Sequence, residues 1–317
     1  MNRRMIINAV GLVLRVEAVL LLLPAIVGML YGEKQTLIAF LISAAISLLL
    51  GLLPKLFLKP KTHVIYAKEG FIIVAFTWIM LSLVGAVPLV LAGAVTSYAD
   101  AFFEIVSGFT TTGSSVLPHG GGLSVLFWRS FTHWVGGMGI IVFVMAILPN
   151  VSERPIHILR AEIPGPTVGK LVPRIKDTAL ILYLIYIGMT VIETIMLLFG
   201  GMSFFESLLH AFGTAGTGGF GIKRDSIAGY SPYIQWVITA FMILFGINFN
   251  LYYLMLLKKF KAVVTSTEIW AYLGIIASSV AVISWNIRHL FVGAEETVRA
   301  AAFQVSSIIS TTGYATT

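Results

Sequence analysis

The sequence has no cysteine and few charged residues. None of its 317 residues is cysteine, so a disulfide framework is excluded and the redox compartment cannot be inferred. Only 11% of the residues are charged, less than half the share of about 25% that soluble domains carry. A water-soluble globular protein is therefore excluded.

Patterns typical of a membrane-embedded enzyme are also absent. The sequence contains neither His-Glu-x-x-His nor Gly-x-Gly-Asp, and no aspartate lies in a long apolar segment. We therefore expect neither enzymatic activity nor a cofactor. A purely structural or receptor protein of the membrane stays open as an alternative.

Long apolar segments are abundant, and hydrophobic residues make up 58% of the chain. A helix that crosses a bilayer needs roughly 17–25 mostly apolar residues. Segments of this kind cover residues 5–30, 37–53, 70–95, 124–148, 178–199, 232–257 and 267–292. Shorter apolar segments near 100–110, 203–214 and 296–308 predict re-entrant helices, which enter the membrane without crossing it. The fold class that we predict is an all-α polytopic membrane protein.

Lysine and arginine are distributed unevenly in this layout. With the N-terminus in the cytoplasm, 14 of the 21 lie in inner loops and only four in outer segments. Basic residues favour the cytoplasmic side, so topology explains the net charge of +7 and nucleic-acid binding is not required. We predict a multi-pass protein of the plasma (inner) membrane, with the three short segments on the outside.

Three Thr-x-Gly stretches recur in register. Thr111, Thr217 and Thr311 each stand two residues before a glycine, and these glycines recur about every 100 residues. Each stretch follows a spanning segment and a short segment, which indicates repeated units of helix, short helix, loop and helix. The predicted division is an N-terminal transmembrane hairpin at 1–60, pore repeats at 61–150 and 151–261, and an incomplete third repeat at 262–317.

The repeated stretches have the chemistry of a potassium filter, which replaces the water shell of the ion with rings of backbone carbonyl oxygens. Glycine permits the backbone angles that such rings require, and threonine adds hydroxyl oxygens. One isolated stretch would be better explained as a turn or a helix-packing face, but three in register favour a filter. The candidate ion-binding residues are Thr111, Thr112, Gly113 and Ser114 in the first stretch, Thr217, Gly218, Gly219 and Phe220 in the second, and Thr311, Thr312, Gly313 and Tyr314 in the third.

Polar residues occupy one shared position on the short helices. Glu104, His210 and Gln304 each stand nine residues before the central glycine. We expect them to brace the short helices through hydrogen bonds. Direct contact with an ion is the alternative, although the position is two helical turns before the loop.

A charged pair is expected near the outer ends of the spanning helices. Arg129 and Glu193 lie at similar estimated depths, and a charge inside the membrane requires a partner. Arg129 can pair with Glu193 or with Glu104. The alternative is that Arg129 extends outward to the membrane surface while the carboxylates bond backbone amides.

Four stretches resemble the Trk/Ktr/HKT superfamily of potassium transporters. AFFEIVSGFTTTGSSV at 101–116 is similar to the first pore loop of that family, and FWRSFTHWVGGMGIIVF at 127–143 is similar to its Trp-x-Gly-Gly-x-Gly helix. HAFGTAGTGGFGI at 210–222 and VSSIISTTGYATT at 305–317 resemble its second and third pore loops. The hairpin that precedes the first repeat resembles the TrkH/TrkG branch.

The resemblance implies a function and partners. It implies potassium uptake, with the potassium ion as substrate, through one pore that is formed by four potassium-channel-like repeats in each subunit of a homodimer. It also implies a cytoplasmic nucleotide-binding regulatory subunit of the TrkA type. A sodium-permeable or weakly selective transporter is the alternative, but glycine at position 113 favours potassium, because family members with serine there pass sodium. A fourth repeat is absent from these residues, so we interpret the sequence as truncated at its C-terminus.

Overall fold

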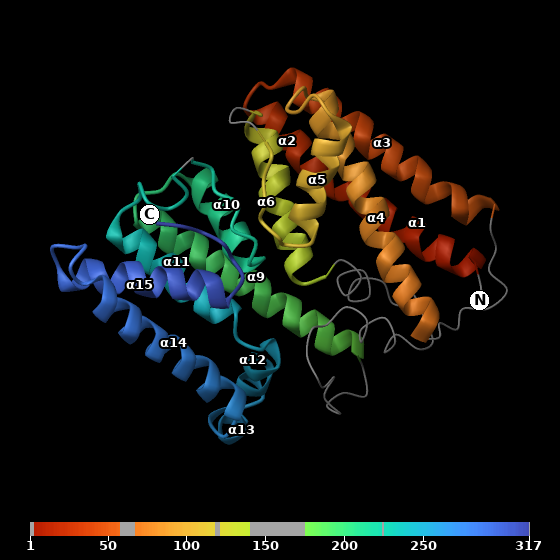
Figure 1. The fold of residues 1–317 in the computed structure, drawn as a ribbon. Coiled ribbons are helices and arrows are strands. Elements are labelled where there is room, and N and C mark those ends of the chain that lie inside the picture. The colour runs from red at the N-terminus through yellow and green to blue at the C-terminus, as the bar shows by residue number, and fades with distance from the viewer. Residues whose placement is uncertain (1–2, 58–66, 118–120, 140–174, 224, 317) are drawn as a thin grey trace. The chain divides into compact units, whose positions relative to one another are not determined.

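The computed structural model describes residues 3–57, 67–117, 121–139, 175–223 and 225–316 (Figure 1). Within these ranges every regular element is a helix, so the prediction of an all-α protein is confirmed. The chain divides into two units, which are described separately. The first unit comprises residues 1–110 and 114–183, and the second comprises residues 111–113 and 184–317.

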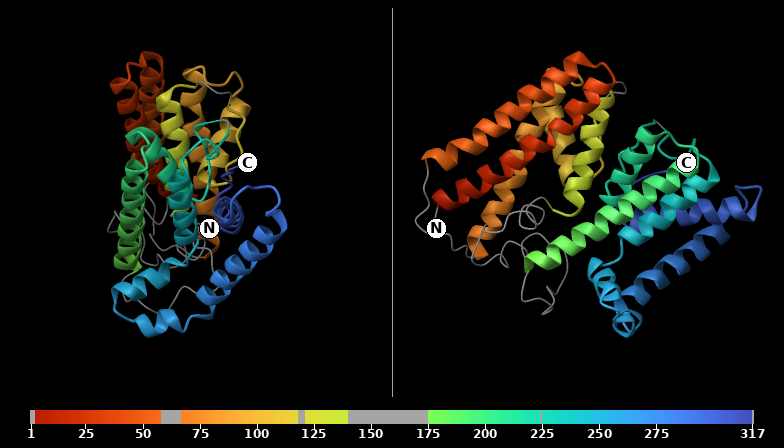
Figure 2. Two further views of the ribbon diagram at one scale, coloured as in Figure 1. Left: turned by 90° about the vertical axis from the view of Figure 1, so that its left-hand side faces the viewer. Right: turned by 180° about the vertical axis from the view of Figure 1, so that it is seen from behind.

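The first unit is a packed group of helices. The N-terminal helices α1 and α3 lie side by side and both contact α4, while α5 contacts α4 and α6 (Figures 1 and 2). The N-terminal hairpin therefore packs on the first helix of the first predicted repeat. The helices of this unit are α1 (Arg3–Leu20), α2 (Leu22–Leu30), α3 (Lys34–Phe57), α4 (Ala67–Leu91), α5 (Tyr98–Phe109) and α6 (Leu123–Gly137).

The second unit contains the other two short helices. Helix α9 (Ile175–Phe199) begins in the first unit and continues into the second, and α15 contacts both α11 and α14 (Figure 1). The remaining helices are α10 (Phe204–Ala215), α11 (Pro232–Phe245), α12 (Phe249–Leu256), α13 (Phe260–Val264), α14 (Thr267–Ile287) and α15 (Ala294–Ile309). The short segments expected near 100–110, 203–214 and 296–308 correspond to α5, α10 and α15.

The long apolar segments form helices with two departures from expectation. In the described part of the chain, five helices are long and apolar enough to cross a membrane, or six if the bent pair α11–α12 counts as one span. The first segment is interrupted at Leu21, because the ring of Pro24 interferes with the turn that precedes it. The segment predicted at 232–257 is also not straight, since α11 and α12 meet at 85°. Residues 140–174, which include the end of the 124–148 segment and most of the stretch that leads to the segment at 178–199, lie outside the described residues.

Serine side chains start the first two short helices. The Ser97 hydroxyl accepts a hydrogen bond from the Ala99 amide at the start of α5, and Ser203 accepts one from the Glu206 amide at the start of α10. Such capping satisfies amides that have no partner within the helix. Helix α15 begins after Gly293 and has no side-chain cap. A serine side chain thus caps α5 and α10, whereas no side chain caps α15.

Glu33 caps the start of α6, a contact that the sequence reasoning missed. Its carboxylate accepts hydrogen bonds from the amides of Leu123, at 2.6 Å, and Ser124, at 3.1 Å, and from the Ser124 hydroxyl, at 2.7 Å. A negative charge at a helix N-terminus is also favoured by the helix dipole. Glu33 thereby ties the N-terminal hairpin to the first predicted repeat.

This cap predicts a pH-dependent stability. Partial burial acts to raise the pKa of Glu33, but hydrogen bonds from Ser124, Leu123 and Thr36 outweigh it, so the pKa lies below its ordinary value of 4.5. A lowered pKa in the folded state contributes stability above the unfolded value, and this contribution is lost as the pH falls below it. We expect the difference in melting temperature between the natural protein and Glu33→Gln to be constant above about pH 5.5 and to shrink below about pH 4.5. A pH-independent difference in thermal melts would contradict the prediction.

Candidate functional site

The three short helices end in Thr-x-Gly loops with the same backbone conformation. We call residues 111–114 loop 1, residues 217–220 loop 2 and residues 311–314 loop 3. The first threonine of each loop has a positive φ, at 54° for Thr111, 53° for Thr217 and 61° for Thr311. The central glycines of the loops also have positive φ, at 78°, 70° and 84°. Loops far apart in the sequence therefore make the same two departures from ordinary backbone.

The hydrogen bonds of loops 2 and 3 explain the left-handed threonines. The amide of Gly218 donates to the carbonyl of Gly213 at 2.9 Å, and the amide of Thr312 donates to the carbonyl of Ser307 at 2.8 Å. This is the Schellman closure of a helix, which places one left-handed residue just after the helix. Glycine usually fills that place, and a β-branched threonine there is strained. The same strained threonine conformation recurs in all three loops.

The central glycines bring successive loops together. A Cβ atom on Gly113 would overlap the carbonyl oxygen of Gly218 in loop 2, and one on Gly219 would overlap the carbonyl oxygen of Thr312 in loop 3. A Cβ on Gly313 would meet nothing within 4 Å in the described part of the chain. Loop 1 thus contacts loop 2, and loop 2 contacts loop 3. The close approach requires glycine at 113 and 219 for space as well as for backbone angle.

Several loop side chains point away from solvent. Phe220 and Tyr314 are each only 1% exposed, and Thr312 is fully buried with its hydroxyl 2.7 Å from that of Ser310. Thr112 and Ser114 are exposed on loop 1. The last residues of loops 2 and 3 therefore support the loops from behind with their side chains.

Tyr314 links loops 2 and 3. Its carbonyl accepts a hydrogen bond from the Ser307 hydroxyl at 2.7 Å, so this oxygen is turned toward its own helix. Its hydroxyl lies 3.3 Å from the carbonyl oxygen of His210 and 3.5 Å from that of Phe220, so these two acceptors share its single proton. The sequence predicts Tyr314 as an ion-binding residue, which stays a prediction; in the structure its hydroxyl joins loop 3 to α10 and to Phe220.

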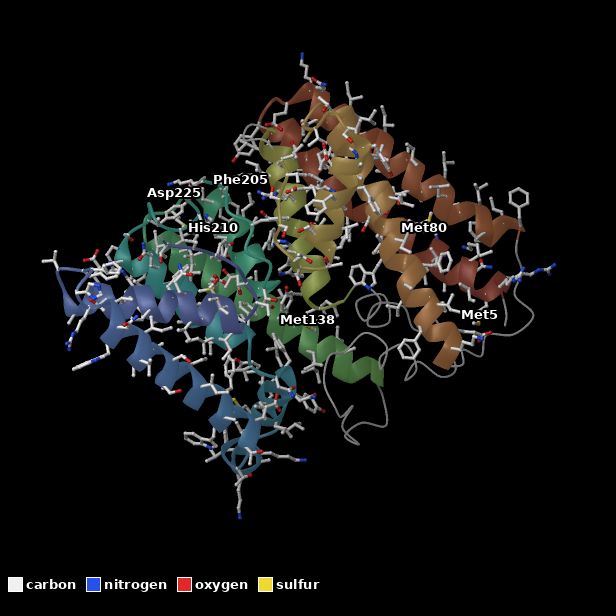
Figure 3. All side chains as sticks on the ribbon, in the orientation of Figure 1. Met5, Met80, Met138, Phe205, His210 and Asp225 are labelled. Carbon is white, nitrogen blue, oxygen red and sulfur yellow. The ribbon has the colours of Figure 1, made fainter. Side chains whose placement is uncertain are left out.

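His210 occupies the centre of a polar chain behind loops 2 and 3. It is fully buried on α10 (Figure 3). Its Nδ1 lies 3.4 Å from the Tyr314 hydroxyl and its Nε2 lies 3.2 Å from the Tyr230 hydroxyl. Tyr230 donates in turn to Glu206 at 3.4 Å. These hydrogen bonds run from the first turn of α10 to loop 3, and the bracing role of His210 stays a prediction.

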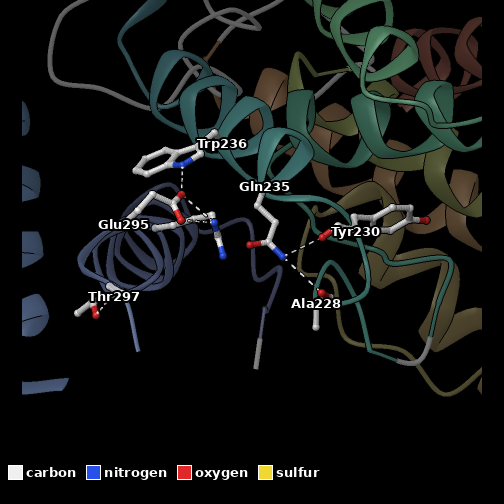
Figure 4. Close-up of polar contacts among 8 residues, drawn as sticks. Ala228, Tyr230, Gln235, Trp236, Glu295 and Thr297 are labelled. Carbon is white, nitrogen blue, oxygen red and sulfur yellow. Dashed lines mark hydrogen bonds and ion pairs between the residues drawn. The ribbon is translucent and has the colours of Figure 1, made fainter. Parts of the chain in front are cut away.

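Tyr230 is a second residue that sequence reasoning missed, and its position depends on Gln235. The Gln235 amide donates to the carbonyl oxygens of Ala228 at 3.3 Å and Tyr230 at 3.2 Å (Figure 4). The same turn contacts the residue just after loop 3, because the Ile227 amide donates to the carbonyl of Ala315 at 2.9 Å. The contact between Ile227 and Ala315 joins residues 88 positions apart, and no local pattern in the sequence indicates it.

Glu104 and Gln304 hold the segments that leave loops 1 and 3. The Glu104 carboxylate accepts hydrogen bonds from the Ser115 hydroxyl and the Val116 amide, each at 2.9 Å. Gln304 donates to the Thr316 hydroxyl at 3.4 Å. Each contact joins the shared position on the short helix to the chain just past the loop.

Arg129 pairs with Glu104 in the structure. The Arg129 Nε lies 2.6 Å from the Glu104 Oε1, and the two side chains are 10% and 0% exposed. Glu193 is fully buried on α9, in the second unit, and among the described residues neither of its carboxylate oxygens accepts a hydrogen bond. Of the two alternative partners predicted for Arg129, Glu104 is the one observed, and Glu193 stays the untested alternative that a double-mutant cycle can examine.

The contacts of Tyr314 lead to a prediction about selectivity. Tyr314→Phe removes the hydroxyl that joins loop 3 to α10 and Phe220, so we expect a stability loss of about 1 kcal/mol together with a several-fold lower preference for potassium over sodium. Tyr98→Phe is the matched control, because the Tyr98 hydroxyl donates to the Leu83 carbonyl at 2.6 Å, away from the loops. Ion competition in rubidium uptake measures the preference. Equal selectivity in both variants would contradict the role of Tyr314.

A family model described as "TrkH: Cation transport protein" matches residues 36–317 of the chain. The chain belongs to the TrkH family. The structural model is similar to the crystal structure of the potassium transporter TrkH from Vibrio parahaemolyticus, with a TM-score of 0.86 and 29% identity over the whole chain. This confirms the polytopic fold class.

Curated relatives of the TrkH family also match this chain in sequence. The Trk system potassium uptake protein TrkH of Salmonella typhimurium is 33% identical over 330 residues, which cover 100% of this chain and 67% of the relative. TrkG of Escherichia coli (strain K12) is 29% identical over 293 residues, covering 90% of this chain and 60% of the relative. In the Vibrio crystal structure the match covers 66% of that chain. The chain thus spans about two thirds of the length of its TrkH relatives.

Proposed function

We propose that this TrkH-family chain takes up potassium across the plasma membrane, through a path lined by backbone carbonyls of loops 1, 2 and 3. The observation that carries the proposal is the shared backbone of the three loops and their successive contacts at Gly113 and Gly219. Carbonyl oxygens that approach one another around an axis can replace the water shell of a cation. The names of the TrkH and TrkG relatives, which are potassium uptake proteins, support the same substrate.

The residues divide into two roles in this proposal. Thr111, Thr112, Gly113 and Ser114, Thr217, Gly218 and Gly219, and Thr311, Thr312 and Gly313 contribute oxygen atoms to the ion path. Glu104, His210 and Gln304, with Phe220 and Tyr314, hold the loops in position. Glycine at the centre of all three loops supports potassium as the preferred ion. The role is transport, so no catalytic residue is assigned.

We extend the proposal to topology and partners. The distribution of lysine and arginine supports a cytoplasmic N-terminus in a multi-pass protein of the inner membrane. The family resemblance supports a homodimer in the lipid bilayer and a cytoplasmic nucleotide-binding regulatory subunit of the TrkA type. Reporter fusions and crosslinking in membranes test these assignments separately from transport.

Uptake in cells tests the function. The natural gene is expressed in a bacterial strain that lacks its own potassium uptake systems, and growth on limiting potassium is measured together with rubidium and sodium uptake. Growth restored by the gene, with rubidium preferred over sodium, is the expected result. Sodium uptake without preference would establish the weakly selective alternative and overturn potassium selectivity. Neither ion moving above background, with the protein present in the membrane, would overturn transport.

A further inference from the structure

Helix α12 runs at a large angle to helix α11, which precedes it. Helix α11 is apolar, and α12 follows it at 85° after a break of only three residues. Asn248 fixes the break, because its side-chain oxygen accepts from the Asn250 amide at 3.0 Å and its amide group donates to Glu268 at 3.3 Å. Where α11 runs along the membrane normal, a turn of 85° directs α12 along the membrane plane. Residues 249–264, which we call the interfacial segment, follow this turn and comprise α12 and α13.

The interfacial segment exposes apolar and basic side chains together. Leu256 is 62% exposed, Phe260 56% and Val264 61%. Three lysines stand among these residues and are exposed. In the described part of the chain none of the three forms an ion pair. The lysines are Lys258, Lys259 and Lys261.

We propose that the interfacial segment lies in the headgroup region of the bilayer and that its lysines bind the phosphates of anionic phospholipids. Large apolar side chains beside lysines are typical of helices that lie in a membrane interface, where basic residues attract anionic lipids. Lysine is depleted at protein–protein interfaces, which favours lipid over a protein partner. Trp270 is 61% exposed, and its indole nitrogen donates a hydrogen bond to the Val264 carbonyl at 2.7 Å. It thus lies at the end of the interfacial segment, and tryptophan is enriched at membrane–water interfaces.

The depth of the segment can be measured by site-directed spin labelling, since the 317 residues contain no cysteine. The protein expressed from its natural gene carries a single label at Leu257→Cys and is reconstituted in vesicles of phosphatidylcholine and phosphatidylglycerol. References are Val282→Cys, which is 69% exposed on α14, and Thr96→Cys, in the exposed loop before α5. We expect the accessibility of Leu257 to oxygen, relative to a water-soluble nickel chelate, to lie between the references. A value equal to that of Thr96 would overturn the interfacial placement.

Lipid preference is tested with a fluorophore at Leu257→Cys and brominated lipids as quenchers. We expect brominated phosphatidylglycerol to quench at lower mole fraction than brominated phosphatidylcholine, with each lysine contributing about fivefold to the preference. The triple variant Lys258→Gln, Lys259→Gln, Lys261→Gln should lose the preference, and Lys34→Gln, at the start of α3, should keep it. If the triple variant does not fold, Lys259→Gln alone should lower the preference about fivefold.

Two quenching results would contradict the proposed lipid site. Equal quenching by both lipids in the natural protein would exclude binding of anionic headgroups. A label shielded from both lipids would show that protein covers the interfacial segment, and the lipid site would then be wrong. Because both measurements follow a label and not ion flux, their failure would leave the transport proposal untouched.

Discussion

Serine at position 219 is expected to abolish potassium uptake in cells that depend on this protein. The added Cβ would overlap the carbonyl oxygen of Thr312 and would lie 3.0 Å from the Tyr314 amide. The backbone of Gly219 also has a φ of 70°, where a residue with a side chain costs about 1–2 kcal/mol. Because the neighbour in each case is backbone and not a flexible side chain, the loop must move. Growth on limiting potassium, with rubidium and sodium uptake measured in parallel, gives the result.

Gly113→Ser extends the same test to loop 1. Its Cβ would overlap the carbonyl oxygen of Gly218, so we expect a large loss of uptake and a lower preference for potassium in whatever uptake remains. The matched control is Gly188→Ser on α9, where a Cβ meets nothing within 4 Å in the described residues and φ is not positive. The filter assignment would be wrong if Gly113→Ser and Gly219→Ser retained both the uptake and the selectivity of Gly188→Ser.

Arg129→Gln is expected to destabilise the protein by about 3–5 kcal/mol, which is the usual cost of removing one member of a buried ion pair. Its partner Glu104 is fully buried and also holds Ser115 and Val116, so an uncompensated carboxylate would remain beside loop 1. Thermal melts in detergent measure the loss. Arg299→Gln is the control, because Arg299 pairs with the exposed Glu295 and should matter little.

A double-mutant cycle identifies the partner of Arg129. Arg129→Gln combined with Glu104→Gln should cost less than the sum of the two single variants, since no unpaired charge stays buried. The same cycle with Glu193→Gln should be additive. Additive losses with Glu104 and coupling with Glu193 would show that the sequence alternative, and not the observed pair, operates in the protein.

Much of the fold could be predicted from the sequence, because apolar length alone determines which segments can span a membrane. The Thr-x-Gly loops could be aligned for a similar reason, since each stands at a fixed distance after its short helix. The sequence could not indicate the 85° bend after α11, because an apolar run has the same composition whether it is straight or broken. The bend depends on Asn248, which caps α12 and donates a hydrogen bond to Glu268 on α14. A single asparagine does not predict a bend, because its partner on α14 is known only from the fold.

The supports of the candidate filter were harder to predict. Glu104 and His210 could be singled out, because polar residues in apolar helices need partners. Their partners could not be named, since Tyr230 and Tyr314 lie 20 and 104 residues away from His210 along the chain. Glu33 was missed for the same reason, because its contacts with α6 join residues 90 or more positions apart.

The Tyr314 contacts have a mechanical consequence. Loop 3 is hydrogen-bonded to α10 and to Phe220, the last residue of loop 2. A displacement of one of these two loops is therefore transmitted to the other. Loop 1 is fastened through Ser115 and Val116 to Glu104 on its own helix. In the proposed filter, an ion of unsuitable radius would displace loops 2 and 3 together, and the strain would then fall on the contact between Gly113 and the Gly218 carbonyl.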